Sequence, residues 1–301
     1  MNRFAPIFVA IAAALWGVDG VVLRPSLYNL PVVLVVFIES SIVALMLSPF
    51  FLKKIDLIKQ LKLKDWLAFF AVGLFGGALG TIAITKALFY VNFVNLSVVI
   101  LIQKLQPVFA LLLAAIVLKE RLPVSFFIWA AFAIIGAYFM TFGAELPNFN
   151  AGNKTTIAAA LSLFAAVSFG SSTVLSKRAL KNVSFGLGTY LRFLVASLIM
   201  LLIVSTTGKI TSITTVSNNQ WLIFLLIAFT TGGAAIFLYY YGLKKISASV
   251  STICELTFPM TAILLDYILH GNMLDIVQWT GLLVMIISIV KVSKINFISS
   301  T

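Results

Sequence analysis

Apolar residues fall into ten runs of about 20 residues along the chain, and short polar segments separate each run from the next. A helix of about 20 residues spans the hydrocarbon core of a bilayer, which is about 30 Å thick. The pattern therefore predicts an all-α membrane protein with ten transmembrane helices. These cover approximately residues 5–24, 31–51, 66–88, 95–117, 124–142, 155–176, 186–206, 220–242, 247–269 and 275–292.

The two halves of the chain resemble each other. Four landmarks of the first half recur in the same order in the second half, at shifts of 152 to 156 residues. Landmarks in one order at nearly one spacing indicate an internal duplication. We expect two five-helix repeats, 1–145 and 146–301. The matched landmarks are Trp16-Gly17 with Phe169-Gly170, Glu39 with Arg192, Gly76-Gly77 with Gly232-Gly233, and Pro107 with Pro259.

An odd number of helices in each half means that the second half enters the membrane from the opposite side. Fifteen of the 21 Lys and Arg residues lie at the helix ends that share a side with the termini, whereas Arg24 and two lysines lie on the other side. Cytoplasmic loops carry the excess of positive charge. The repeats are therefore expected to have inverted topology in the cell (inner) membrane, with both termini in the cytoplasm.

Composition narrows the class of protein. The chain of 301 residues is 61% hydrophobic and 10% charged, whereas soluble domains are about 45–50% apolar and about 25% charged. The net charge of +12 reads as membrane topology and not as nucleic-acid binding. Cys254 is the one cysteine, which excludes a disulfide framework or a zinc cluster within one chain. No cofactor is expected.

The fourth apolar run contains Gln103, Lys104, Gln106 and Pro107 near its middle. A lysine at that depth costs about 2.5–3.5 kcal/mol on insertion scales, so it usually faces a cavity or a partner. Pro107 cannot donate to the carbonyl of Gln103, so the helix should bend there. The alternative is a kinked helix whose polar groups only bond to a neighbouring helix.

The ninth run holds the matching feature. Glu255 lies four residues before Pro259, so the carbonyl freed by this proline should be that of Glu255 itself. A pseudo-twofold axis would place Glu255 opposite Lys104 near the bilayer centre, where inverted-repeat transporters bind substrate. The alternative is a structural ion pair between Lys104 and Glu255 that locks the halves together.

Two residues of the first run are further site candidates. Asp19 lies three residues after Trp16, on the same helical face, and could bind a substrate amine or take up a proton. Its alternative is a packing role, bonded to a neighbouring helix. Trp16 with Tyr239–Tyr241 could line an aromatic cavity, although a membrane-interface belt is the favoured interpretation of the tyrosines. Glu39 could pair with Lys86, although snorkelling of Lys86 to the headgroups is favoured.

At this point the sequence resembles drug/metabolite transporters of the EamA type over nearly its whole length. The resemblance rests on Trp16-Gly17, the glycine-rich third helix, Pro107 and the segment Lys119-Glu120-Arg121-Leu122. It implies ten helices around a central cavity and export of small metabolites such as amino acids. One departure is His270-Gly271-Asn272-Met273, which stands where the second repeat should show the acidic-basic end motif.

Together these observations predict a secondary transporter that exports a small molecule by alternating access, with the lipid bilayer and candidate coupling protons as its other partners. Lys104, Gln103 and Gln106 would hold a substrate carboxylate, and Glu255 or Asp19 would meet an amine or exchange a proton. An intramembrane enzyme is the alternative from another class, but HExxH and Walker motifs are absent. A channel-like structural subunit is the third.

Overall fold

The computed structural model describes residues 4–52, 55–90, 99, 102–146, 152–271 and 273–295, and the described part is helical throughout its regular elements. The elements are α1 Ala5–Val18, η1 Asp19–Leu23, η2 Arg24–Leu27, α2 Val32–Phe51, α3 Ile55–Lys59, α4 Leu63–Val72, η4 Gly73–Leu79, α5 Gly80–Tyr90, α7 Gln106–Leu113, η5 Ala114–Leu118, α8 Val124–Phe142, α9 Gly152–Ala179, α10 Phe185–Thr206, η6 Lys209–Thr215, α11 Asn218–Ile227, η7 Ala228–Gly232, α12 Gly233–Lys245, α13 Ala248–Cys254, α14 Thr257–His270 and α15 Ile276–Ser293.

Within the described residues, nine helical segments are long and apolar enough to cross a membrane, and Gln106–Leu118 is a shorter apolar helix. These ten segments correspond to the ten predicted spans. The predicted fourth span, 95–117, falls partly on residues outside the described ranges, so only its second half is seen as a helix. The all-α membrane fold is confirmed.

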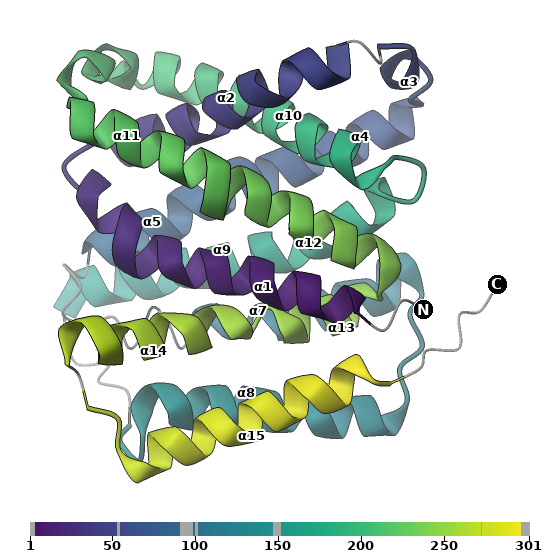
Figure 1. Cartoon of the computed structure of the whole chain (residues 1–301), viewed down its shortest axis with the longest axis vertical. Coiled ribbons are helices and arrows are strands. Elements are labelled where there is room, and N and C mark those ends of the chain that lie inside the picture. Colours follow the sequence, from purple (N-terminus) through teal and green to yellow (C-terminus); the bar gives the residue numbers. More distant parts are fainter. Residues whose placement is uncertain are drawn as a thin grey trace.

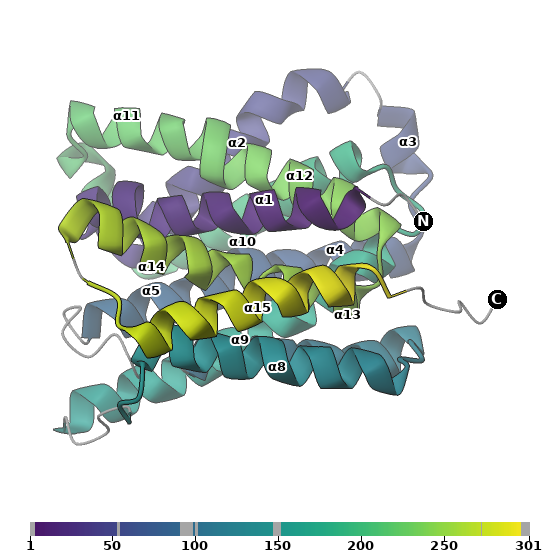
Figure 2. The same cartoon turned by 60° about the horizontal axis from the view of Figure 1, so that its bottom comes forward.

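The two halves run in opposite directions through the bundle. In Figure 1, α1 starts at the end of the molecule where both chain termini lie, and α9 starts at the opposite end. We call these the terminal end and the distal end. The same arrangement is visible after the turn in Figure 2. The chain therefore folds as two five-helix repeats of inverted topology.

Peripheral helices frame a central group. In Figure 1, α8 and α15 form a pair at one extreme of the long axis, and α2, α10 and α11 lie toward the other. Between them, α1 packs against α12, α13 and α14, while α9 packs against α5 and α7. Helices α8 and α15 approach closely because Gly136 has no side chain. A Cβ at this position would lie 2.8 Å from the Gly281 carbonyl oxygen.

Gly73, Gly76, Gly77 and Gly80 of the third span form two interleaved GxxxG patterns, and small residues at this spacing predict close helix packing. A Cβ on Gly73 would lie 2.8 Å from Val195 Cγ1, and one on Gly77 would lie 2.6 Å from Ala196 Cβ, both on α10. Gly76 meets the Ser172 side chain of α9 in the same way. The predicted packing role of these glycines is confirmed.

Gly17 and Gly170 lie where the two repeats pack against each other. A Cβ on Gly17 of α1 would lie 2.9 Å from the Phe258 carbonyl of α14, and one on Gly170 of α9 would lie 3.0 Å from the Gln106 carbonyl of α7. Each repeat thus packs its first helix against the proline-containing helix of the other repeat. This cross-packing brings Pro107 and Pro259 to the centre of the bundle.

Candidate functional site: a pocket between two broken helices

A pocket lies between the two proline-containing helices. Its free space is about 40 Å³, enough for a few water molecules and too little for a metabolite. We call this narrow arrangement of the pocket the closed form. The residues that line the pocket are Gln103, Lys104, Gln106, Pro107, Thr252, Glu255, Leu256, Phe258 and Pro259.

Both helices are interrupted just before their prolines. The helix around Ile102 stops, and α7 begins at Gln106, with Val108 N donating to Leu105 O at 3.0 Å. In the second repeat α13 ends at Cys254 and α14 begins at Thr257. The predicted breaks are present, but the expectation of a free Glu255 carbonyl is wrong. Phe258 N donates to that carbonyl at 3.0 Å, because the turn tightens and recovers the bond.

The Glu255 carboxylate is the best-connected polar group of the pocket. Gln106 Nε2 donates to its Oε2 at 2.7 Å, and the Tyr239 hydroxyl donates to its Oε1 at 2.8 Å. Thr173 Oγ1 lies 3.3 Å from Oε1. The donors come from α7, α12 and α9, so three elements from both repeats fix one carboxylate.

Lys104 bonds α8 and not Glu255. Its Nζ donates to the Ala137 carbonyl at 2.7 Å and to the Thr141 hydroxyl, both on α8. Among the described residues, no ion pair joins Lys104 to Glu255. The structural alternative of a direct Lys104–Glu255 pair is therefore wrong for this closed form. Lys104 is also not presented to the pocket as a free cation, since a backbone carbonyl and a hydroxyl accept its bonds.

The aromatic residues lie behind Glu255. The Trp16 ring of α1 is 5.3 Å from the Tyr239 ring, centroid to centroid, at 54°. Tyr239 is 3% exposed and Tyr240 is fully buried. The favoured interpretation of these two tyrosines as an interface belt is wrong, because their hydroxyls bond Glu255 and Ser176 inside the bundle. The cavity-wall alternative fits Tyr239 and Trp16 better.

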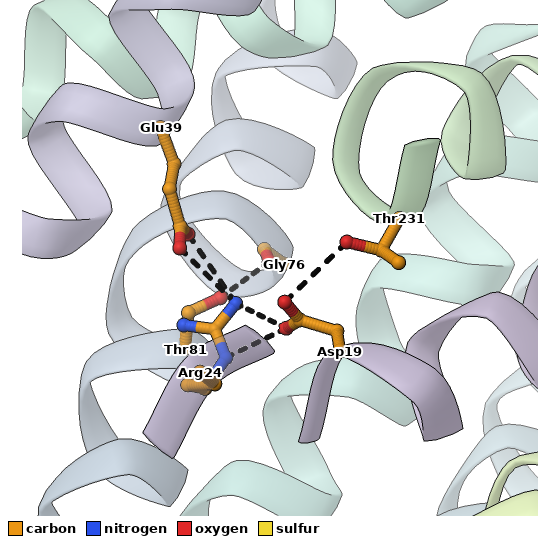
Figure 3. Close-up of polar contacts among 6 residues, drawn as sticks. All are labelled: Asp19, Arg24, Glu39, Gly76, Thr81 and Thr231. Atoms are coloured by element: carbon orange, nitrogen blue, oxygen red, sulfur yellow. Dashed lines mark hydrogen bonds and ion pairs between the residues drawn. The ribbon is translucent and has the colours of Figure 1, made fainter. Parts of the chain in front are cut away.

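Asp19 belongs to a second polar centre at the distal end of the first repeat. Arg24 lies between Asp19 and Glu39, and Thr231 approaches Asp19 from η7 (Figure 3). Arg24 Nε and Nη2 are 2.7 and 2.5 Å from Asp19 Oδ2. Nη2 is also 3.2 Å from Glu39 Oε1. Asp19, Arg24 and Glu39 are hereafter the Arg24 triad.

The triad corrects two sequence interpretations. The charge distribution counts Arg24 as an outer residue at the end of the span 5–24, but its side chain is only 17% exposed because η1 and η2 continue α1. Glu39 bonds Arg24, and the suggested pairing with Lys86 is wrong, since Lys86 is exposed on α5. The signal in the sequence was an arginine five residues after an intramembrane aspartate, at the last position of the predicted span 5–24.

Comparison with known proteins defines the class of this chain. The EamA-like transporter family matches residues 3–142 and again residues 156–294. The chain therefore belongs to the EamA-like transporter family, and it is an integral membrane secondary transporter. The predicted division at residues 145 and 146 falls between the two matches and stays a prediction.

A full-length relative is the riboflavin transporter ImpX of Fusobacterium nucleatum subsp. nucleatum. It is 46% identical to this chain over 291 residues, which cover 96% of this chain and 97% of the relative. A crystal structure of a more distant protein has a TM-score of 0.75 at 16% identity, and the match covers 98% of this chain and 97% of the other. That likeness supports the fold. Amino acids as substrates receive no support from these comparisons.

Proposed function

We propose that this transporter moves riboflavin across the cell membrane through the pocket between its broken helices. The observation that carries the proposal is the identity of 46% with a riboflavin transporter, sustained over nearly the full length of both chains. The direction of transport has no such support, so export stays a prediction from the sequence.

The chemistry of the pocket is compatible with a neutral heteroaromatic ligand. Riboflavin carries an uncharged three-ring system whose edge alternates carbonyl and N–H groups, and side-chain amides such as those of Gln103 and Gln106 can both donate to and accept from such an edge. Trp16 and Tyr239 would supply flat apolar surface next to Glu255. A zwitterionic amino acid fits less well, because Lys104 already donates to α8.

We further propose that transport requires the two breaks to separate. The closed pocket has room for only a few water molecules, so Pro107 and Pro259 would act as hinges that open it to one side at a time. Irregular backbone at the midplane is where inverted-repeat transporters place their binding sites. Gln103, Gln106, Glu255 and Trp16 are the proposed binding residues, whereas Asp19 and Lys104 are assigned other roles.

The terminal end is proposed to face the cytoplasm, as the positive-inside rule predicts. The segment η6, between α10 and α11, and helix α3 lie at opposite ends of the bundle (Figure 1). Thr214 of η6 and Lys59 of α3 are both exposed. Cys254 is buried and gives a low background for thiol labelling. An impermeant maleimide added to cells should label Thr214→Cys and spare Lys59→Cys. The reverse pattern would refute the orientation.

Counterflow in proteoliposomes tests the substrate. Vesicles preloaded with riboflavin should take up labelled riboflavin faster than vesicles that contain buffer alone. Unlabelled amino acids should not compete with this uptake. Glu255→Gln should lose this exchange. Tyr241→Phe serves as the matched control, because Tyr241 packs on Phe8 and Lys245 and, within the described part of the chain, forms no hydrogen bond with Glu255. Exchange of an amino acid but not of riboflavin would overturn the proposal.

A further inference from the structure

The Arg24 triad contains more negative groups than positive ones. Two carboxylates, Asp19 and Glu39, share one guanidinium, so the triad has a formal charge of −1 when all three groups are ionised. Their side chains are 10%, 13% and 17% exposed for Asp19, Glu39 and Arg24. An uncompensated charge in such surroundings is costly and is normally removed by a proton or by a partner ion.

The geometry shows which carboxylate is the weaker partner. Asp19 Oδ2 accepts from both Nε and Nη2 of Arg24, at 2.7 and 2.5 Å. Glu39 reaches only Nη2, at 3.2 and 3.4 Å. Arg24 Nη1 is buried without a hydrogen-bond partner in the described part of the chain. The arginine is thus committed to Asp19, and Glu39 is the carboxylate left with the weaker compensation.

The charged groups of the surrounding elements do not supply the missing positive charge. Helix α2 packs against α5, α10, α11, η4, η6 and η7, and η1 packs against α14. Segment η4 carries no charged residue, and α14 carries the titratable residues Asp266 and His270. Lys86 of α5 and Lys209 of η6 are exposed, and Arg192 of α10 bonds the Gly76 carbonyl and the Tyr240 hydroxyl. Helix α11 carries no charged residue, and Thr231 of η7 donates to Asp19. The phenol of Tyr28, one turn after Arg24, is a further titratable neighbour.

The second repeat has no equivalent acid. At the shift of 153 residues, Asp19, Arg24 and Glu39 correspond to Ser172, Lys177 and Arg192. The corresponding positions thus hold two cations and a hydroxyl, so the protein has one such carboxylate pair and not two. A site that occurs once in a duplicated protein can respond to one ion per molecule.

The triad is also connected to the pocket. Asp19 lies one helical turn after Trp16, whose ring contacts Tyr239, and Tyr239 donates to Glu255. η1 further packs against α14, the helix that contains Pro259. A change in the charge of the triad can therefore reach the pocket through α1 and α14, two packed helices.

We propose that the Arg24 triad is a proton-binding site, that Glu39 carries the proton, and that substrate transport is coupled to it. The proton adds to a Glu39 carboxylate oxygen and neutralises it, so that Arg24 pairs with Asp19 alone. The proton is released when the site is exposed to the other side of the membrane. A metal ion is disfavoured, since no group of three or more His, Cys, Asp and Glu residues among the described residues lies where it could hold one.

Transport measurements test the coupling, which rests on riboflavin being carried. If one proton moves per riboflavin, a gradient of one pH unit can sustain a concentration ratio of about tenfold. Wild type should approach this ratio, and Glu39→Gln and Asp19→Asn should lower it to about one while retaining riboflavin counterflow, since each removes the excess charge. Asp56→Asn, in an exposed pair with Lys59, should behave as wild type. Accumulation driven by a sodium gradient alone, or unchanged coupling in both variants, would overturn the proposal.

A spectroscopic measurement keeps the proton site testable if riboflavin is not the substrate. Infrared difference spectra of the purified protein between acidic and basic buffer report the carbonyl stretch of protonated carboxyl groups. A band present in wild type and Asp56→Asn and absent in Glu39→Gln is the expected result. Identical spectra for wild type and Glu39→Gln would contradict protonation of Glu39, whatever the transported molecule is.

Discussion

The two proline-containing helices have the same backbone break but carry different polar side chains. Both stop and restart just before the proline, and each is packed by the first helix of the opposite repeat through Gly17 or Gly170. The first repeat offers Lys104, which donates to α8 within its own repeat. The second offers Glu255, which accepts bonds from α7, α9 and α12. Both repeats therefore contain the break, but the polar side chain beside it differs. Lys104 has a structural role within its own repeat, whereas the Glu255 carboxylate accepts bonds from residues of both repeats.

Removing the carboxylate should have the largest effect. Glu255→Ala leaves the Gln106 amide and the Tyr239 and Thr173 hydroxyls without their acceptor, and we expect a loss of about 2–3 kcal/mol in unfolding free energy. Transport should fall by at least about 100-fold. Thermal unfolding in detergent beside counterflow measures both. A stable and active Glu255→Ala variant would show that neither folding nor transport requires the Glu255 carboxylate.

Removing one donor to Glu255 should have a smaller effect. Tyr239→Phe deletes the hydroxyl 2.8 Å from Oε1 and keeps the ring that contacts Trp16, so we expect a cost of about 1 kcal/mol and about tenfold slower transport. Tyr241→Phe should change neither quantity. Equal losses in the two variants would indicate a general effect of the tyrosine run.

The pocket also contains a hydroxyl that the closed form leaves unused. Thr252 lines the pocket, and its Oγ1 is buried without a hydrogen-bond partner among the described residues. Thr252→Val should keep or slightly raise stability, because it removes an unsatisfied polar atom. It should weaken riboflavin binding about fivefold if the hydroxyl bonds the substrate, and Thr252→Ser should retain binding. Unchanged binding in Thr252→Val would leave the hydroxyl without a role in the site.

The smallest effect is expected at Lys104. Its partners are a carbonyl and a hydroxyl, so Lys104→Met leaves no buried carboxylate behind, and replacing a buried charge by an apolar side chain is often neutral or stabilising. We expect a stability change below about 1 kcal/mol and transport within about twofold of wild type. A loss as large as that of Glu255→Ala would restore the sequence interpretation of Lys104 as a substrate ligand.

The elements that could be predicted from the sequence are those set by local chemistry. Apolar runs define the spans, Pro107 and Pro259 define the breaks, and glycine spacing in the third span defines a close contact, because each follows from backbone sterics within a few residues. The matched landmarks added the duplication, and the odd number of helices in each half added the inverted relation between the halves. These features need no knowledge of how a helix is rotated in the bundle.

Side-chain partners could not be predicted in the same way. In a span that is apolar on all sides, the periodicity does not show which face meets which neighbour, so Lys104 was matched with Glu255 when it bonds α8. Arg24 was missed for another reason. The π-helical η1 and the 3-10 helix η2 extend α1 and place Arg24 between Asp19 and Glu39. The predicted span 5–24 instead puts Arg24 at the outer membrane boundary.

Binding of riboflavin to the purified protein tests the central claim most directly. Flavin fluorescence is quenched when the ring stacks on an aromatic side chain, so a titration in detergent reports occupancy of the pocket without a transport assay. We predict saturable quenching for wild type, and binding at least about tenfold weaker for Gln106→Leu, with Tyr241→Phe unchanged. Absence of saturable quenching in folded wild-type protein, or equal binding by Gln106→Leu, would contradict the account.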